Sequence, residues 1–309
     1  MMWILTLPSV QSGSASIWRA DRLLRRWGAL TLLLLGVSLS LGSAVASTSS
    51  VSPVLTVTLS GNGITNTNDP YAYYVNMLRL ALEKTRATDG DFDINFHDHG
   101  GGIERDRAML IAGAGIDAMW ASVTRERAEK LRVIDIDLLK GLNNYRALLI
   151  HQNNKARFAS VKTLHDLKKF KTGTGPYWTD GIILKDNGFM LTYGSNYGGL
   201  FKMLSLRRFD FFSRGLHEIY SDLAAYGDLG LIQAPHLLLK YDHPVHYCFF
   251  VNKENTALAD RIERGLRLAL ADGSFDALFF SMPGFQYGYS LLRDAQQQVL
   301  VIHNKTNLQ

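Results

Sequence analysis

IDAMWASVTRERAEKLRVIDI, residues 116–136, is the most informative stretch of the chain. Its apolar start predicts a β-strand, and Ser122 places a hydroxyl where that strand ends. Thr124 has the position of an N-cap for a short helix that carries Arg127. The strand end, the free backbone N–H groups of the cap and a guanidinium then meet at one point, which suits a carboxylate. A solvated helix face made of the charged residues 125–127 explains the same spacing, so both interpretations stay open.

Around this stretch, short apolar runs alternate with helical patterns, which is typical of an α/β fold. No low-complexity linker interrupts them, so any two domains are joined by ordered strands. Asp69 and Pro70 have the pattern of an N-cap and a first helical residue. The spacing of apolar residues predicts strands at 54–59, 92–96, 116–121, 145–151, 189–193, 209–212 and 246–251. It predicts helices at 70–85, 105–112, 161–170, 179–187, 197–206, 215–226 and 257–272. An extended segment is expected at 133–139, and 229–239 is a mixed apolar stretch.

The composition bounds the class of protein. The chain has 309 residues, of which 47% are hydrophobic and 20% charged, so it is globular and long enough for roughly two domains. The net charge is +5, but the first 46 residues contribute +3 and the rest only +2. This balance argues against a nucleic-acid binder that neutralises phosphates in bulk. A single cysteine, Cys248, excludes an intramolecular disulfide and multi-thiolate metal centres, and its apolar neighbours predict a buried hydrophobic residue.

The first 46 residues have the pattern of a secretory signal. A basic cluster, Arg22, Arg25 and Arg26, precedes an apolar segment at 27–40. A run of small residues with an A-x-A pattern follows at 42–46, which predicts a signal peptide over 1–46 and cleavage after Ala46. A membrane anchor is the alternative, but the strongly apolar core is shorter than the ~20 residues needed to span a bilayer. We therefore expect export to the periplasm.

A second candidate site is the glycine-rich turn TGTGPYW, residues 172–178. Glycines let a backbone approach a ligand closely, and Pro176 is placed to start a helix with outward N–H groups. The turn is not a P-loop, because no Lys-Ser/Thr pair follows its second glycine. Trp178 and Asp180 add a stacking surface and an acceptor. A plain strand-to-helix turn is the alternative interpretation.

Three motifs resemble one known family. The run D-A-x-x-x-S-x-T-x-x-R, residues 117–127, is similar to the first-domain signature of periplasmic solute-binding proteins of family 3, the polar amino-acid binders of ABC importers. SVKTLHDLKKFKTGTGPYW, residues 160–178, resembles the family's entry to its second domain, and RRFDFF, residues 207–212, resembles its R-x-D strand. The similarity runs over most of 54–282 and looks like that of a divergent member.

The resemblance implies a type II periplasmic binding protein fold, with two α/β lobes joined by two hinge strands. Lobe 1 is then 47–144 plus 246–309, and lobe 2 is 145–245, with hinges near 145–148 and 242–247. A ligand binds between the lobes and hinge closure buries it.

The resemblance also implies roles for individual residues. The family's carboxylate-binding arginine falls on Arg127 and a ligand-binding hydroxyl on Ser122. The turn at Thr174 and Gly175 supplies donors from the second lobe. The candidate aromatic neighbours of the ligand are Tyr71, Trp120 and Trp178.

One departure leaves the ligand class open. Members that bind α-amino acids usually hold the ammonium group with an acidic residue four or five positions after the R-x-D aspartate, here Asp210. Those positions hold Arg214 and a glycine. If Arg214 faces the cleft, the ligand is anionic at both ends or lacks a free amine. Alternatively, Glu218 or Asp222 takes the ammonium group, or Arg214 and Glu218 form an i,i+4 salt bridge.

Other chemistry has little support. The His97-Asp98-His99 pattern suggests a metal, but no third ligand is evident and glycines follow, so we expect neither a metal nor a cofactor. No G-x-S-x-G elbow or acid-oriented histidine indicates a catalytic site.

We therefore expect a monomeric solute-binding protein that delivers a small polar carboxylate-bearing ligand to an ABC permease and binds no nucleic acid. The alternatives are a periplasmic dehydratase or lyase that uses Glu218, Asp180 or a histidine as base, and a free-standing sensor acting through a membrane receptor.

Overall fold

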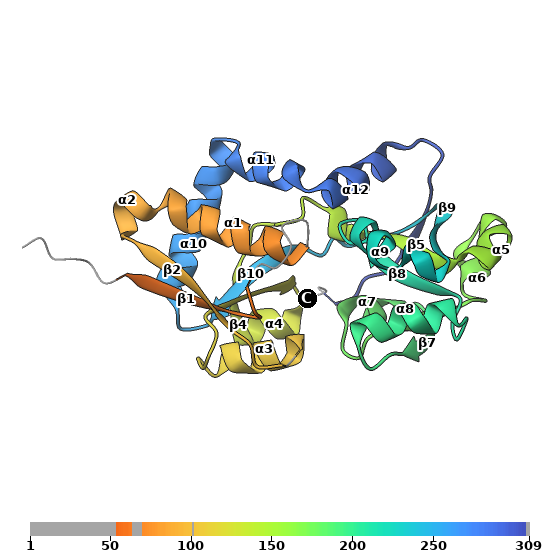
Figure 1. Ribbon diagram of the computed structural model, residues 1–309, viewed down its shortest axis with the longest axis horizontal. Coiled ribbons are helices and arrows are strands. Elements are labelled where there is room, and N and C mark those ends of the chain that lie inside the picture. The colour runs from red at the N-terminus through yellow and green to blue at the C-terminus, as the bar shows by residue number, and fades with distance from the viewer. Residues whose placement is uncertain (1–53, 64–69, 101, 307–309) are drawn as a thin grey trace, which may run out of the picture. The chain divides into compact units, whose positions relative to one another are not determined.

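The computed structural model describes residues 54–63, 70–100 and 102–306, which all belong to one structural unit, Val51–Gln309 (Figure 1). The predicted signal peptide, 1–46, and the predicted N-cap Asp69 lie outside the described residues, so both stay predictions. No helix in the described part of the chain is long and apolar enough to cross a membrane.

The first part of the chain, together with β10 from its last third, forms two small sheets. β1 and β2 pair in parallel, and β10 lies antiparallel between β3 and β4, with Tyr247 opposite Ser122. This register places the end of the predicted binding strand beside the start of β10. The elements are β1 (Leu55–Ser60), α1 (Pro70–Lys84), α2 (Arg86–Asp89), β2 (Phe92–His97), α3 (Ile103–Ile111), β3 (Ala118–Ser122), α4 (Arg125–Lys130), β4 (Leu131–Ile134), η1 (Leu142–Asn144) and β10 (Tyr247–Asn252).

A larger sheet follows, with the strand order β11-β9-β5-β8-β6-β7. β5 runs antiparallel to both neighbours, and Arg146 lies opposite Gly215 in this pairing. The parallel pairs are β6 with β7, β6 with β8, and β11 with β9. The elements are β5 (Tyr145–His151), η2 (Gln152–Asn154), α5 (Lys155–Ala159), α6 (Leu164–Leu167), β6 (Lys171–Thr174), α7 (Thr179–Asp186), β7 (Met190–Tyr193), α8 (Tyr197–Ser205), β8 (Phe211–Gly215), α9 (Ile219–Tyr226), η3 (Gly227–Leu229), β9 (Leu231–Tyr241) and β11 (Gln298–Ile302).

Helices α10 (Thr256–Ala271), α11 (Ser274–Ser281) and α12 (Pro283–Arg293) complete the fold. Helix α10 packs on α1 through residues at helical spacing, among which Leu258, Ile262 and Leu266 are buried. A Cβ at Gly265 would lie 1.9 Å from the backbone oxygen of Ala81, so the glycine permits this close contact. Each buried leucine or isoleucine side chain contributes about 1.5–3 kcal/mol relative to exposure.

Several sequence predictions are corrected here. The helix predicted over 215–226 begins only at Ile219, because the residues before it extend β8 through Gly215. The helix predicted over 161–170 is confined to α6, which Thr163 starts with a capping box. Pro176 does not start a helix, since α7 begins at Thr179 with Trp178 as its N-cap residue. The stretch 229–239 is largely strand β9, and α5, α11, α12 and β11 were not predicted.

The last strand differs from the predicted lobe assignment. The sequence groups 246–309 with the first lobe, whereas β11 pairs in parallel with β9 in the six-stranded sheet. This pairing joins residues that are far apart in sequence, so no local pattern could indicate it. The lobe boundaries themselves stay a prediction.

Candidate ligand-binding site

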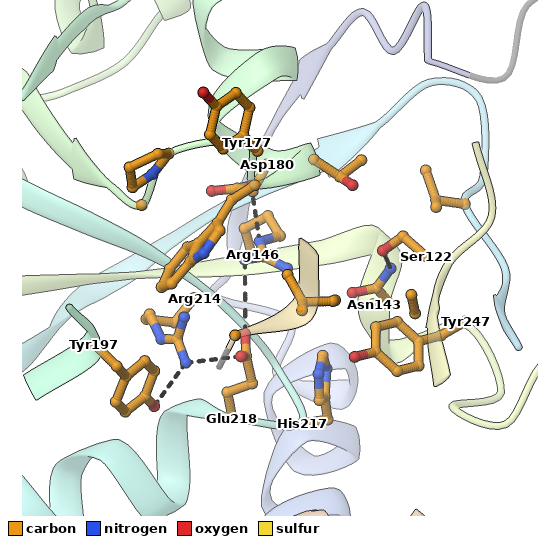
Figure 2. Close-up of a pocket in the computed structure, with 18 of the residues that line it drawn as sticks. Ser122, Asn143, Arg146, Tyr177, Asp180, Tyr197, Arg214, His217, Glu218 and Tyr247 are labelled. Atoms are coloured by element: carbon orange, nitrogen blue, oxygen red, sulfur yellow. Dashed lines mark hydrogen bonds and ion pairs between the residues drawn. The ribbon is translucent and has the colours of Figure 1, made fainter. Parts of the chain in front are cut away.

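A pocket of about 450 Å³ brings together elements from the three-stranded and six-stranded sheets (Figure 2). Ser122 lies at the end of β3, Arg146 on β5, and Arg214 at the end of β8. Among the residues predicted from the sequence, those that line the pocket are Ser122, Arg127, Gly175, Trp178, Asp180, Arg214 and Glu218.

The other predicted residues, Tyr71, Trp120 and Thr174, do not line this pocket. The Tyr71 hydroxyl donates to the Ser60 carbonyl at 2.6 Å, and its ring meets Trp120 edge-on at 5.3 Å. Trp120 in turn stacks on Tyr74. Thr174 is buried at the end of β6. Tyr71 and Trp120 are thus part of an aromatic cluster with Tyr74, and Thr174 is part of the buried end of β6.

Arg127 occupies the position that the sequence predicted. The Thr124 hydroxyl accepts a hydrogen bond from the Arg127 backbone N–H at 3.3 Å, which confirms the predicted N-cap. The guanidinium donates from Nη1 to the Ser122 carbonyl at 2.9 Å and to the Thr179 hydroxyl at 3.2 Å. Its Nε is buried without a hydrogen-bond partner, and no carboxylate in the described part of the chain forms an ion pair with it.

The burial of Arg127 has an energetic cost. Only 7% of the residue is exposed, and burial lowers the pKa of its guanidinium because the charged form loses hydration. An anion in the pocket would supply the missing counter-charge to the guanidinium, which lines the pocket. Asn143 donates to the Ser122 hydroxyl at 3.3 Å, so three polar side chains line this part of the pocket. We call Ser122, Arg127 and Asn143 the open wall.

Arg146 lies inside the opposite part of the pocket. Its Nε is 3.1 Å from Asp180 Oδ1, and its Nη2 is 3.7 Å from Glu218 Oε2. Burial lowers the pKa of Arg146, but the charges of Asp180 and Glu218 outweigh it and raise the pKa, so the guanidinium stays charged. The hydroxyls of Ser213 and Tyr241 also donate to Asp180 Oδ1.

Arg214 is held by two carboxylates. Its Nε donates to Asp222 Oδ2 at 2.6 Å, and its Nη2 donates to Glu218 Oε1 at 2.7 Å and to the Tyr197 hydroxyl at 2.9 Å. The i,i+4 salt bridge that the sequence left open as one alternative is therefore present, and Asp222 extends it. We call Arg146, Asp180, Arg214, Glu218 and Asp222 the paired cluster; it holds two positive and three negative formal charges.

The pKa shifts in the paired cluster follow from this geometry. Burial raises the pKa of Glu218, but the charges of Arg214, His217 and Arg146 and a hydrogen bond from the Gly215 N–H hold it at about 2. Burial and the neighbouring charge of Glu218 raise the pKa of Asp222, although Arg214 opposes this. Glu218 is thus firmly ionised and already engaged by the protein.

His217 was missed as a specific site residue. It lines the pocket, is 5% exposed, and its Nδ1 is buried without a partner. Burial lowers the pKa of its imidazole to about 4, so the ring is neutral at pH 7. A Cβ at Gly215 would lie 2.4 Å from the ring, so this glycine makes room for it. Figure 2 shows the ring between Glu218 and Tyr247.

The glycine-rich turn supports an aromatic side of the pocket. A Cβ at Gly175 would come within 2.3 Å of the Trp178 indole, so the indole lies directly on the Gly175 backbone. The indole also stacks on Phe212. Tyr177 lines the pocket with 73% of its surface exposed and has a φ of 61°, which is unusual for a residue with a Cβ.

Further lining residues were not predicted from the sequence. Arg146 had a usable signal, because a charged residue inside the apolar run 145–151 indicates a buried and paired charge. No local signal marked Asn143, Tyr197, Tyr241 or Tyr247, which are among the other lining residues.

Comparison with known proteins establishes the fold. No family model matches the chain, and a search of curated proteins finds no match. An ancestral arginine-binding protein bound to arginine is 18% identical with a TM-score of 0.56, covering 74% of this chain and 98% of that one. An arginine-specific periplasmic binding protein of Salmonella typhimurium is 15% identical with a TM-score of 0.56, covering 74% and 99%. A histidine kinase sensor domain is 14% identical with a TM-score of 0.57, covering 76% and 97%.

The chain therefore has the α/β fold of the periplasmic binding proteins, as the sequence predicted. The resemblance to family 3 is confirmed at the level of the fold, since amino-acid-binding proteins are among its structural neighbours.

Proposed function

We propose that this protein is an exported solute-binding protein that captures a small carboxylate-bearing ligand and delivers it to an ABC-type importer. The observation that carries this proposal is Arg127, a buried guanidinium on the pocket wall with an unpartnered Nε and no ion pair to a described carboxylate. A ligand carboxylate supplies the counter-charge that this guanidinium lacks. The volume of about 450 Å³ lies within the range of small-molecule sites.

The remaining groups indicate what the rest of the ligand offers. Glu218 and Asp222 both form ion pairs with Arg214, which disfavours either of them as the main partner of a ligand ammonium group. The hydrogen bonds and ion pairs described for Asp180 all use Oδ1, so Oδ2 is available to a ligand donor. His217 adds a neutral imidazole. An amino acid that binds through Asp180 and a related organic acid that binds through His217 are both compatible with this pocket.

A ligand screen tests the proposal directly. Thermal unfolding of the purified protein is followed with amino acids, dicarboxylates, opines and small anions, and every hit is repeated in Arg127→Ala. A ligand at 100 times its Kd stabilises the protein by about 2.7 kcal/mol. Arg125→Ala is the matched control, because Arg125 is an exposed arginine on the same helix. The proposal would be contradicted if a compound stabilised Arg127→Ala as much as the unmodified protein, or if no compound in the panel raised the Tm.

A sensor role is the second candidate. The similarity to a histidine kinase sensor domain supports it at the level of the fold. In both cases we propose a monomer located in the periplasm after cleavage behind Ala46, whose partner is a membrane permease or receptor and not a nucleic acid. Binding without turnover is favoured over the dehydratase or lyase alternative, because the neighbours named above are binding or sensor proteins. Pull-down of a permease rather than a receptor from membranes would separate the two roles.

A further inference from the structure

A second group of ligand-type side chains lies outside the pocket, where the segment between β9 and β10 meets the residue after β11. Asp242 and His243 follow β9, and His303 follows β11. One nitrogen of each imidazole and one oxygen of the carboxylate all lie within 4.8 Å of one another. His303 Nδ1 contacts Asp242 Oδ2, and His243 Nε2 lies 4.0 Å from the same oxygen.

The backbone holds this group in place. Asp242 Oδ1 accepts hydrogen bonds from the N–H groups of His243 and Asn304, both at 2.8 Å. This leaves Oδ2 directed at the imidazoles. The fully buried Asn304 donates from Nδ2 to the His243 carbonyl at 2.9 Å, and Asn187 Oδ1 accepts from the His303 N–H at 3.0 Å. The two hydrogen bonds to Asp242 Oδ1 are of the kind that orients a metal-ligating carboxylate, and the Asn304 and Asn187 bonds hold the backbone of the two histidines.

We infer that Asp242, His243 and His303 form a binding site for a first-row divalent cation, with Zn²⁺ as the preferred occupant. Two imidazoles and one carboxylate suit Zn²⁺ better than Mg²⁺ or Ca²⁺, which prefer oxygen ligands. Ligand atoms around a four-coordinate zinc ion are roughly 3.3 Å apart. The site therefore requires the two exposed imidazoles to rotate to this spacing, with a water molecule as the fourth ligand.

A second trio, Asp135, His246 and Cys248, has similar spacing but is less suited to a cation. Cys248 is completely buried within β10, so a metal would have to enter the apolar core to reach its sulfur. The first trio is exposed, with 51% of the His243 side chain and 44% of the His303 side chain accessible. A cation there connects the segment that follows β11 to the segment between β9 and β10, one of the two predicted hinges.

The test measures metal binding to the purified, untagged protein after treatment with a chelator. Titration calorimetry with ZnCl₂ is expected to give one site per chain, and MgCl₂ to give none. His243→Ala and His303→Ala are each expected to weaken Zn²⁺ binding at least about tenfold, since loss of outer hydrogen bonds alone costs that much in other sites. His165→Ala, which removes an exposed imidazole on α6, is expected to bind as the unmodified protein does.

Two further measurements keep the assignment specific. Zn²⁺ is expected to raise the Tm of the unmodified protein but not that of the double variant His243→Ala/His303→Ala, and circular dichroism verifies that the variant is folded. Co²⁺ bound to the site is expected to lack the charge-transfer band of a cobalt–thiolate bond. Absence of saturable Zn²⁺ binding, full binding by the double variant, or loss of binding in His246→Ala with a thiolate band would each overturn the assignment.

Discussion

The open wall and all of the paired cluster except Asp222 line the same pocket, yet the buried arginines of the two groups have opposite surroundings. Arg214 is 3% exposed and meets two carboxylates, whereas Arg127 is 7% exposed and meets only a carbonyl and a hydroxyl. Burial of a charge is expensive unless a partner compensates it. The comparison indicates that the paired cluster stabilises the structure. In the open wall, the buried charge of Arg127 destabilises the protein until a ligand compensates it.

The largest expected effect comes from breaking the paired cluster. Asp222→Ala removes the carboxylate that meets Arg214 Nε and leaves that guanidinium partly unpaired in a buried site. Removal of one partner of a buried ion pair typically costs 3–5 kcal/mol, so we expect the free energy of unfolding to fall by about that much. Urea unfolding followed by circular dichroism measures it. Asp222→Asn keeps the shape and an acceptor and is the control; equal stability of all three proteins would show that the cluster is not structural.

Arg127→Ala is expected to change the stability of the protein little and to weaken ligand binding strongly. Because the loss of two Arg127 hydrogen bonds is offset by removal of a buried charge that has no ion-pair partner among the described residues, the free energy of unfolding without ligand is expected to change by less than about 1 kcal/mol. Truncation of one partner of a buried charge pair costs about 2–5 kcal/mol of binding, so the affinity for a carboxylate ligand is expected to fall at least about 30-fold. Calorimetry with a hit from the screen, and with Arg125→Ala alongside, measures this. A stable variant that retains affinity would place the carboxylate elsewhere.

The sequence predicts contacts between near neighbours along the chain better than contacts between residues that are far apart in sequence, and the two arginines illustrate this. The cap at Thr124 and the position of Arg127 follow from residues that are near neighbours along the chain, and the structure confirms the cap. The Arg214–Glu218 pair was one of three local alternatives, and choosing among them required Tyr197 and Asp222 to be placed in space. His217 carried no signal, because its importance comes from burial beside elements distant in sequence.

The acid dependence of stability reports on His217, which lies beside the paired cluster, and on Glu218 within it. Burial lowers the pKa of His217 to about 4 from its ordinary value of 6.5, so the unfolded chain takes up a proton at a higher pH than the folded protein does. The stability that this residue contributes is complete above pH 6.5 and is lost as the pH falls toward 4, by about 2–3 kcal/mol at pH 4.5. Glu218, with its pKa held at about 2, adds a further loss below its ordinary 4.5.

His217→Gln tests the histidine contribution. The variant keeps a polar side chain that does not titrate, so its unfolding free energy is expected to fall less between pH 7.5 and pH 4.5 than that of the unmodified protein. Urea unfolding at both pH values measures the difference. Mutation of an exposed imidazole, His165→Ala, is expected to leave the pH dependence unchanged. Identical pH profiles for His217→Gln and the unmodified protein would mean that this imidazole is solvated.

The smallest expected effect concerns the hydroxyl of the open wall. Ser122→Ala removes the acceptor of the Asn143 amide at 3.3 Å and a hydrogen bond to the ligand, while the Ser122 carbonyl still accepts from Arg127. One hydrogen bond contributes about 1 kcal/mol, so we expect the affinity for a carboxylate ligand to fall about fivefold with little change in Tm. Arg127 keeps its place in this variant. The affinity lost in Ser122→Ala, compared with that lost in Arg127→Ala, therefore shows how much the hydroxyl and the charge each contribute to ligand binding. A Ser122→Ala loss as large as that of Arg127→Ala would mean that the strand end, and not the guanidinium, orients the ligand.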